Sequence, residues 1–588
     1  MVDLQTMRTR ARSPRTRHVG WRIVSVFVTG LVIAIFAWWP MVAAYPQTQG
    51  GDGPVFHKML EASRISVLRY HELPLWQPYE CGGIPLWDNP QAPVAAPLTL
   101  PILFLGVTIT IYLWYVLHSA FGFACMWFFA RDEVKLSLPA TFVASAAWAY
   151  SGFHQSHYSG GHFVFVPFLY FPLAFLLWRR AQNDLRYALG LGWLVAWMLH
   201  EGAVYPLPHL FVFLFVETLT RLDRKSLVPI VRASTVVLAC AVTVGASRLL
   251  PVMDQLTSHT RPIGAENDHI QWQTLKDMFL ARTHERYVVG QSYVWPEYST
   301  YMGPCVLFLG LLGLVAAAFE APWLVLLAGV AFVLMMGHFS PYAPWAVMKA
   351  HVFPFKEMRV PSRFRCEVSM FIALFAGLSI DRLPKRLAAF APRGAERLRF
   401  ALLAIALVGA GDVLTTGNFL FLSAFTNPPE AKVTASTRLF VHGSDLASLI
   451  DQPRQNRMRL ACWDEWGFSA GAPMWEGDVP QARPAPAQDA IVEVVNRTQN
   501  KFSLKIVANA PARILINSGY DRGWRTSVGT LSDQDKLLVL DVPAGRHTVG
   551  LEYWPHGLTV GLVLAFVGLV GSIAAFVKLS SRKTTVGG

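Results

Sequence analysis

An aspartate in a glycine-rich turn is the first residue whose type and setting suggest chemistry. Asp52 lies in Gln49-Gly-Gly-Asp-Gly-Pro54, soon after an apolar run that ends near Tyr45. The glycines permit a tight turn, so the carboxylate can face a cleft without steric obstruction. A carboxylate in that position can act as a general base on a hydroxyl group or hold a cation. The alternative is an ordinary turn aspartate with no role in chemistry.

Two further acids are candidates for the same role. Asp88 lies in Trp87-Asp-Asn-Pro90, and it could replace Asp52 as the base or join it in holding a divalent cation. Glu201 ends an apolar run, where a carboxylate is costly unless it is paired or faces water. Glu201 is therefore either a second catalytic or acceptor-binding carboxylate, or a partner of His200 or Arg248.

Basic residues near the same loops are candidates for binding a phosphate group. An arginine fork matches phosphate oxygens well, whereas the alternative is that these side chains reach towards lipid headgroups. Lys356, Arg359 and Arg363 belong to one segment, Phe355–Phe364, and Arg359 and Arg363 are the preferred pair within the set. The predicted phosphate-binding residues are Lys58, Arg248, Lys356, Arg359 and Arg363.

Histidine, tryptophan and amide side chains form a third group of candidates. Trp76 and Trp87 are interpreted either as anchors at the membrane interface or as stacking surfaces for a sugar. The histidines at 154, 157 and 162 lack the glutamate and the helical spacing of a metalloprotease motif, so substrate hydrogen bonding is favoured over metal binding. The predicted substrate-binding residues are His57, Trp76, Trp87, Asn89, Gln91, His154, His157 and His162.

The composition of the chain indicates a membrane protein. Of its 588 residues, 53% are hydrophobic and 15% are charged, whereas soluble domains carry about 25% charged residues. The net charge of +13 comes from Lys and Arg in short links between apolar runs, a topology signal that argues against nucleic-acid binding. The six cysteines include no C-x-x-C pair, which excludes a zinc site of the usual local kind and leaves a disulfide open.

Twelve apolar runs are predicted to be membrane-spanning helices. The first follows an arginine-rich start, exceeds a signal-peptide core and has no clear cleavage site, so it is predicted to remain and to begin in the cytoplasm. An even number of spans with basic links inside also places both termini in the cytoplasm. The runs lie near 21–45, 108–130, 138–151, 163–178, 185–201, 208–220, 229–250, 302–319, 322–337, 366–381, 398–424 and 556–577.

The longer polar segments then fall on the outer side of the membrane. They lie near 46–107, 152–162, 251–301, 338–365 and 425–555, and they hold most of the candidate residues. From Ala490 the chain alternates in short strands separated by turns, which predicts a small antiparallel β-sandwich. We therefore expect a transmembrane module at 1–424, a β-rich outer domain at 425–555, and a last helix and cytoplasmic tail at 556–588.

Several motifs spread along the chain carry a resemblance to a known family. They are Gly51-Asp-Gly53, LPLWQPYECGGIPLWDNPQAPVAAPLTL from Leu73, Ser151-Gly-Phe-His154, Tyr301-Met-Gly-Pro304, the segment Phe355–Phe364, Gly519–Trp524, Val542–His547 and Tyr553-Trp-Pro555. In order and spacing they resemble the YfhO-type bacterial membrane proteins, within the GT-C superfamily of glycosyltransferases.

The resemblance implies an inverting sugar transfer from a polyprenyl-phosphate donor to a glycan or lipid acceptor of the cell envelope. It places the reaction on the outer face of the bacterial plasma membrane and makes Asp52 the general base. No cofactor is implied with certainty, and a divalent cation stays open. Two rival interpretations remain, a lipid or glycan transporter (flippase) and a non-catalytic envelope assembly protein.

Overall fold

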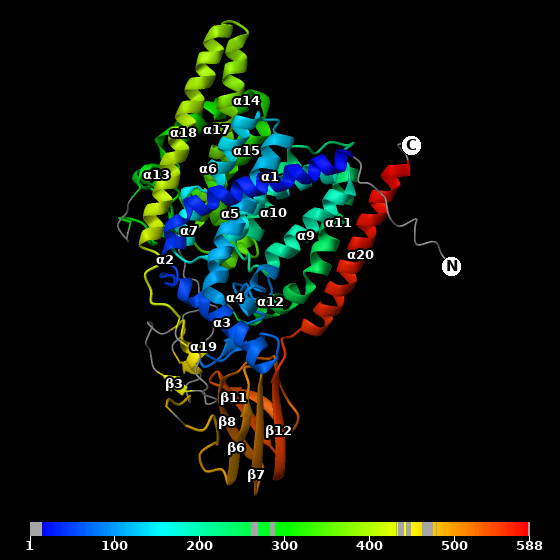
Figure 1. The fold of residues 1–588 in the computed structure, drawn as a ribbon. Helices are drawn as coiled ribbons and strands as arrows, with labels where there is room; N and C mark the ends of the chain where they lie inside the picture. Colours follow the sequence, from blue (N-terminus) through cyan, green and yellow to red (C-terminus); the bar gives the residue numbers. More distant parts are fainter. Residues whose placement is uncertain are drawn as a thin grey trace, which may run out of the picture.

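The computed structural model describes residues 14–259, 268–282, 288–430, 432, 440–442, 449–460, 462, 474–477 and 479–585. Helices make up most of the chain as far as Leu422, and β-strands dominate from Ala482 to Tyr553. In Figure 1 the long helices form one body and the strands form a smaller body at one end of it.

Each of the twelve predicted runs falls on a helix of the structure. Seven of the described helices are long and apolar enough to cross a membrane. In two of these, α1 and α20, only 22% and 11% of the apolar window is buried, so the apolar side chains point outwards, as they do towards lipid. The chain is therefore a multi-pass membrane protein, and the number of twelve spans stays a prediction. The helices are α1 (Pro14–Ala37), α5 (Val107–Asp132), α6 (Leu138–Ala149), α8 (Phe171–Ala181), α9 (Leu185–His200), α10 (Pro206–Leu219), α11 (Leu227–Val244), α14 (Gly303–Glu320), α15 (Pro322–Met335), α17 (Arg365–Ala388), α18 (Pro392–Leu422) and α20 (Leu558–Thr585).

Shorter helices connect the long ones. In Figure 1, α3 and α12 lie where the helical body meets the strands. Proline and glycine punctuate these segments and keep the helices short. They are α2 (Trp39–Ala44), α3 (Gly53–Tyr70), α4 (Ile102–Leu105), α7 (Gly152–Ser159), α12 (Ala246–Ser258), α13 (Trp272–Leu280), α16 (Pro344–His351), α19 (Gln452–Gln455) and the 3-10 turns η1 (Pro97–Thr99), η2 (Phe163–Tyr170), η3 (Trp295–Glu297), η4 (Phe355–Glu357) and η5 (Pro361–Phe364).

The predicted β-rich region is a sandwich of two four-stranded antiparallel sheets. Their orders are β10-β11-β8-β5 and β6-β7-β12-β9. Alternate apolar side chains of β7, β8, β11 and β12 meet in one core between the sheets. The strands are β5 (Ala482–Pro484), β6 (Ala490–Arg497), β7 (Lys501–Ala508), β8 (Ala512–Gly519), β9 (Trp524–Thr526), β10 (Thr530–Gln534), β11 (Leu537–Val542) and β12 (Gly545–Tyr553).

The loop that follows α3 is anchored to the sandwich. Its short hairpin of β1 (Trp76–Gln77) and β2 (Ile84–Pro85) inserts Trp76 into the sandwich core, with its ring 4.6 Å from that of Tyr553. The backbone N–H of Trp76 donates to Oδ1 of Asn500 at 3.0 Å. Trp76 therefore packs in a protein core and faces neither lipid nor the cavity described below.

Two smaller features complete the connection. Strands β3 (Phe440–His442) and β4 (Arg457–Arg459) form a short parallel pair. A disulfide joins Cys81 of the first loop to Cys462.

Candidate functional site

Two glycine turns in direct contact place the Asp52 carboxylate. Gly51 has φ +60°, and an added Cβ would lie 2.7 Å from the carbonyl oxygen of Gly160. Gly161 has φ +81°, and its added Cβ would lie 2.2 Å from the backbone nitrogen of Gly53. The N–H of Asp52 donates to the Gly160 oxygen at 2.9 Å. Only glycine tolerates these conformations and approaches, so this contact fixes the start of α3 against the end of α7.

The Asp52 side chain faces a histidine instead of capping its helix. Asp52 occupies the N-cap position of α3, but its carboxylate accepts no capping hydrogen bond. Its Oδ2 lies 3.2 Å from Nε2 of His162, and the side chain is 44% exposed. A half-exposed carboxylate with one oriented neighbour can still receive a proton from a bound molecule.

A line of hydrogen bonds continues from His162 into the protein. Nδ1 of His162 lies 2.7 Å from Nδ1 of His157, and Nε2 of His157 accepts from Nη2 of Arg365 at 2.8 Å. Burial, and then the charge of Arg365, lower the pKa of His157 well below its ordinary value. His157 is therefore neutral at pH 7.

A buried arginine forms another wall of the site. Nε of Arg363 donates to Oε2 of Glu297 at 2.9 Å, and Nη2 donates to Oε1 of the same carboxylate. The guanidinium carbon lies 4.1 Å from the ring centre of Tyr205 and 4.8 Å from that of Phe165. Nη1 of Arg363 has no hydrogen-bond partner among the described residues, although it is buried.

The charge of Arg363 also lowers the pKa of its partner, Glu297. Burial alone would raise the pKa of Glu297, but the charge and the hydrogen bonds of Arg363 outweigh this effect and lower the pKa to about 2. The same pairing raises the pKa of Arg363 despite its burial. Both side chains are therefore ionised at neutral pH.

The Asp52 carboxylate and the ion pair of Arg363 and Glu297 face one cavity of about 420 Å³. One part of its lining is polar and carries both signs of charge, and another part is aromatic or aliphatic. The lining residues are Asp52, Val55, Phe56, Met59, Gln91, His162, Val164, Phe165, Tyr205, Glu297, Arg359, Arg363 and Cys462. The cavity can hold a molecule that has an anionic group, a hydroxyl-bearing part and an apolar part.

Of the predicted site residues, Asp52, Gln91, His162, Arg359 and Arg363 line the cavity. His157 does not line the cavity, but it contacts His162, which does.

Other predicted residues have partners of their own. The sequence predicts that Lys58 binds a phosphate. In the structure its ammonium group is fully buried in an ion pair with Glu80, so it is not exposed to a ligand. Nε2 of His57 lies 2.7 Å from Oε1 of Glu430. Lys356 is exposed and does not line the cavity.

The second candidate base, Asp88, contacts the end of strand β12 of the sandwich. Its Oδ2 accepts from the Tyr553 hydroxyl at 3.0 Å. Burial, and then the charge of Asp521, raise the pKa of Asp88 well above its ordinary value. Because Asp88 does not line the cavity, it is not placed to share a cation with Asp52.

The segment next to Asp88 is held by backbone contacts. Nη2 of Arg248 donates to the carbonyl oxygen of Ala92 at 2.6 Å and to that of Asn89. Oδ1 of Asn89 accepts from the N–H of Gln91 at 3.0 Å. The indole of Trp87 donates to the Ser247 oxygen at 2.9 Å. These contacts fix the loop that carries Gln91 into the cavity.

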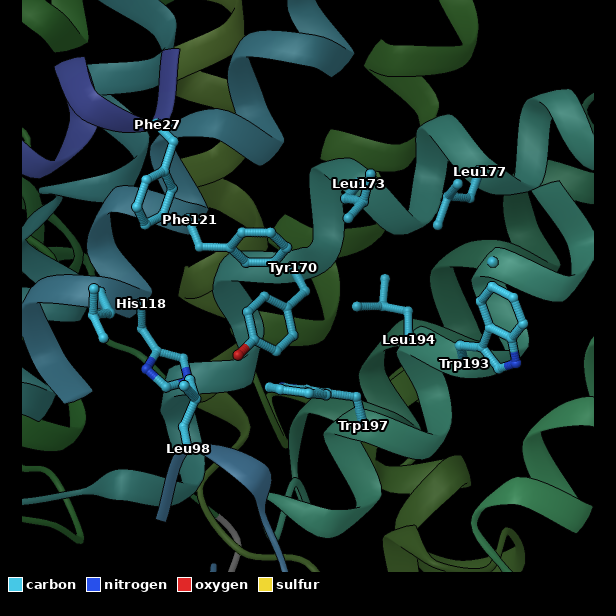
Figure 2. Close-up of a pocket in the computed structure, with 12 residues that line it drawn as sticks. Phe27, Leu98, His118, Phe121, Tyr170, Leu173, Leu177, Trp193, Leu194 and Trp197 are labelled. Carbon is cyan, nitrogen blue, oxygen red and sulfur yellow. The ribbon is translucent and has the colours of Figure 1, made fainter. Parts of the chain in front are cut away.

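Glu201 contacts three side chains that line a second, mainly apolar cavity of about 450 Å³. Its carboxylate contacts Nε2 of His118 at 2.9 Å, the Tyr170 hydroxyl at 2.9 Å and the Trp197 indole at 2.7 Å. Figure 2 shows these three ring side chains at one end of the cavity. Glu201 is therefore satisfied by neighbours other than the predicted His200 or Arg248.

The third histidine of the predicted trio lies apart from the other two. His154 is buried against Trp148 and Phe153, and neither ring nitrogen has a hydrogen-bond partner among the described residues. The described residues also hold no group of three or more His, Cys, Asp or Glu arranged to bind a metal ion.

Several lining residues of the site were not among the sequence predictions, and Glu297 and Tyr205 are two of them. Glu297 follows Trp295-Pro in a long polar segment, and Tyr205 follows Glu201 closely. Arg365 lies two residues beyond Arg363 and is fully buried. The signal for Glu297 was weak, because an isolated acid in a long loop is usually solvated.

The fold and the site together define a multi-pass membrane protein with a charged cavity near its β-sandwich. No known protein family matches the sequence, and no curated protein does. Among solved structures, the chain is similar to the arabinofuranosyltransferase AftD from Mycobacteria, with 12% identity and a TM-score of 0.42. The similarity covers 68% of this chain and 27% of that one, so the chain spans about a quarter of its length.

Proposed function

We propose that the protein is a glycosyltransferase that moves a sugar from a polyprenyl-phosphate donor to a hydroxyl group of a cell-envelope glycan or lipid. The observation that carries this proposal is one cavity in which the Asp52 carboxylate and the Arg363 guanidinium lie on the same lining. A base and an anion-binding group are the two requirements of sugar transfer from a lipid phosphate.

In the proposed reaction, Asp52 accepts the proton of the acceptor hydroxyl. The acceptor oxygen forms a bond to the anomeric carbon from the face opposite the phosphate, and the bond between that carbon and the phosphate oxygen breaks. The electron pair leaves with the lipid phosphate, whose charge is balanced by Arg363 and Arg359. The transfer inverts the anomeric configuration because it proceeds by one displacement.

The wall of the cavity suits the rest of such a donor. Tyr205 and Phe165 offer aromatic faces for a sugar ring, and Phe56 and Met59 offer apolar contact for the first carbons of the lipid. The second cavity, between α1, α5, α8 and α9, provides further apolar room among helices predicted to span the membrane. Both features support a donor with a hydrocarbon chain.

The chain should transfer sugar outside the cytoplasm. Cys462, which forms a disulfide with Cys81, lines the cavity, and disulfides persist in oxidising compartments. The basic links predicted to be cytoplasmic include Arg179 and Arg180 at the end of α8. Both signals support an extracytoplasmic sandwich and cytoplasmic termini.

Cysteine labelling tests this orientation. We expect an impermeant maleimide to modify Asp535→Cys in the sandwich on intact cells, and Phe390→Cys between α17 and α18 only after permeabilisation. Both native side chains are exposed. The opposite labelling pattern would reject the proposed topology.

A larger residue at position 190 should impair use of long lipid donors. An added Cβ at Gly190 meets only Leu177, at 3.5 Å, so Gly190→Leu extends into the second cavity. Excluding about two methylene groups costs about 1.6 kcal/mol, or about 15-fold in KM for a long-chain donor. Kinetics with long-chain and short-chain donors measure the difference.

The matched control is Gly571→Leu on α20, where an added Cβ meets nothing within 4 Å. We expect this variant to behave as the wild type with both donors. An equal loss with both donors in Gly190→Leu would indicate general damage and contradict a chain-binding role.

Donor turnover tests the proposed function itself. Purified protein is incubated with radiolabelled polyprenyl-phosphate sugars and a membrane extract as the source of acceptor. Label transferred to a glycan or lipid supports the proposal. Absence of turnover with every donor, together with substrate-dependent transport in proteoliposomes, would favour the transporter interpretation instead.

A further inference from the structure

The line of contacts behind Asp52 begins at a side chain that can only donate hydrogen bonds. Arg365 is fully buried, and its guanidinium also donates to the backbone oxygens of Ser299 and Pro296, at 2.9 and 2.7 Å. An arginine has no acceptor atom and keeps its protons in proteins. Nε2 of His157, at 2.8 Å from Nη2, must therefore be the acceptor.

This one constraint determines the protonation of both histidines. Because Nε2 of His157 accepts, neutral His157 carries its proton on Nδ1 and donates it to Nδ1 of His162 at 2.7 Å. His162 must then carry its own proton on Nε2, the nitrogen that lies 3.2 Å from Asp52. The N–H of His162 is thus directed to the carboxylate, and each residue in the line sets the tautomer of the next.

The same line prevents His162 from becoming positively charged. A second proton on His162 would have to sit on Nδ1, where it would meet the Nδ1 proton of His157. The line also cannot carry a proton away from Asp52, because Arg365 has no site to receive it. Its effect is therefore to orient the carboxylate and to keep a neutral neighbour beside it.

We propose that His157 and Arg365 are positioning residues, which lock His162 in its neutral Nε2–H tautomer and so fix the orientation of the Asp52 carboxylate. This inference rests on the proposed function for its kinetic consequences, whereas the tautomer itself does not depend on it.

The other charged groups around the two histidines are compatible with this assignment. They are Glu297 of η3, Arg363 of η5, Arg365 at the start of α17, Asp52 before α3 and the neutral His154 of α7, and Arg359 lines the same cavity as His162. The charge of Glu297 is matched by Arg363. Arg365 is then the positive group in direct contact with the line.

Replacing His157 in two ways tests the proposal. His157→Phe keeps a ring beside Phe153 and Phe165 but removes both nitrogens. His157→Gln restores one acceptor for Arg365 and one donor for His162. We expect His157→Phe to lower kcat between about tenfold and a hundredfold, as a misplaced catalytic group does, and His157→Gln to recover most of it.

The recovery in His157→Gln separates positioning from general damage, because only a side chain that bridges Arg365 and His162 restores the line. Equal rates in the two variants would overturn the proposal.

Nitrogen NMR of labelled histidines decides the question without any activity measurement. The resonance of His162, assigned by its loss in His162→Gln, should show the Nε2–H tautomer in the wild type. An Nδ1–H tautomer in the wild type would overturn the inference, even if His157→Phe does not fold. A wild-type protein with the expected tautomer but no transfer activity would instead reject the proposed function alone.

Discussion

Replacing Asp52 with asparagine should abolish sugar transfer while leaving the protein folded. Removal of a general base costs about 10²- to 10⁴-fold in rate, and asparagine cannot accept the acceptor proton. The amide has the shape of the carboxylate, and its oxygen can still face Nε2 of His162. Because the side chain is 44% exposed and caps no helix, we expect little change in the free energy of unfolding. Donor turnover and thermal unfolding measure the two effects.

Asp88→Asn and Glu201→Gln serve as controls for this result. Both native carboxylates are buried and bound to neighbouring side chains away from the cavity of Asp52. We expect both variants to retain transfer in proportion to the amount of folded protein. Full activity in Asp52→Asn would reject Asp52 as the base, and a specific loss in one control would transfer that role to its carboxylate.

The helices of this chain could be predicted because long apolar runs have few alternatives. The run predicted at 366–381, for example, lies within α17, and that at 229–250 covers α11 and the first part of α12. The strands after Ala490 were equally visible, because apolar and polar residues alternate there. The boundaries of the short helices around the site were not visible, since proline and glycine interrupt every local pattern.

Only part of the site could be predicted from the sequence, because its geometry depends on contacts between distant segments. Asp52 and His162 each lie in a glycine-rich segment, but the contact between Gly51 and Gly160 depends on how α3 and α7 pack. Local sequence does not encode such a long-range approach. The ion pair of Lys58 and Glu80 has the same origin, because a loop folds back over 22 residues to join them.

Aromatic residues show the same limit. Trp76 lies in a loop rich in Pro, Gly and Trp, which is typical of an anchor at the membrane interface. It packs instead in the core of the sandwich, whose residues lie more than 400 positions later in the chain. A tryptophan gains as much by burial in either setting, so its type does not distinguish them. Only the sandwich decides the outcome, because Tyr553 at the end of β12 and Asn500 just before β7 receive Trp76.

Replacing Arg363 with methionine should damage both stability and transfer, and a second substitution should separate the two effects. Arg363→Met leaves Glu297 buried without its counter-charge, which costs about 3–5 kcal/mol. The paired carboxylate has a pKa of about 2 in the folded protein and about 4.5 ordinarily, so it stabilises the wild type above pH 4.5, and this contribution is lost as the pH falls towards 2. In the double variant Arg363→Met, Glu297→Gln no unpaired charge remains, so we expect most of the stability to return. Transfer should stay at least a hundredfold low in the double variant, because the guanidinium that balances the leaving phosphate is still absent. Thermal unfolding against pH and donor turnover measure these outcomes. If transfer returned together with stability, Arg363 would be a structural residue, and the phosphate would have to be held by other groups of the cavity.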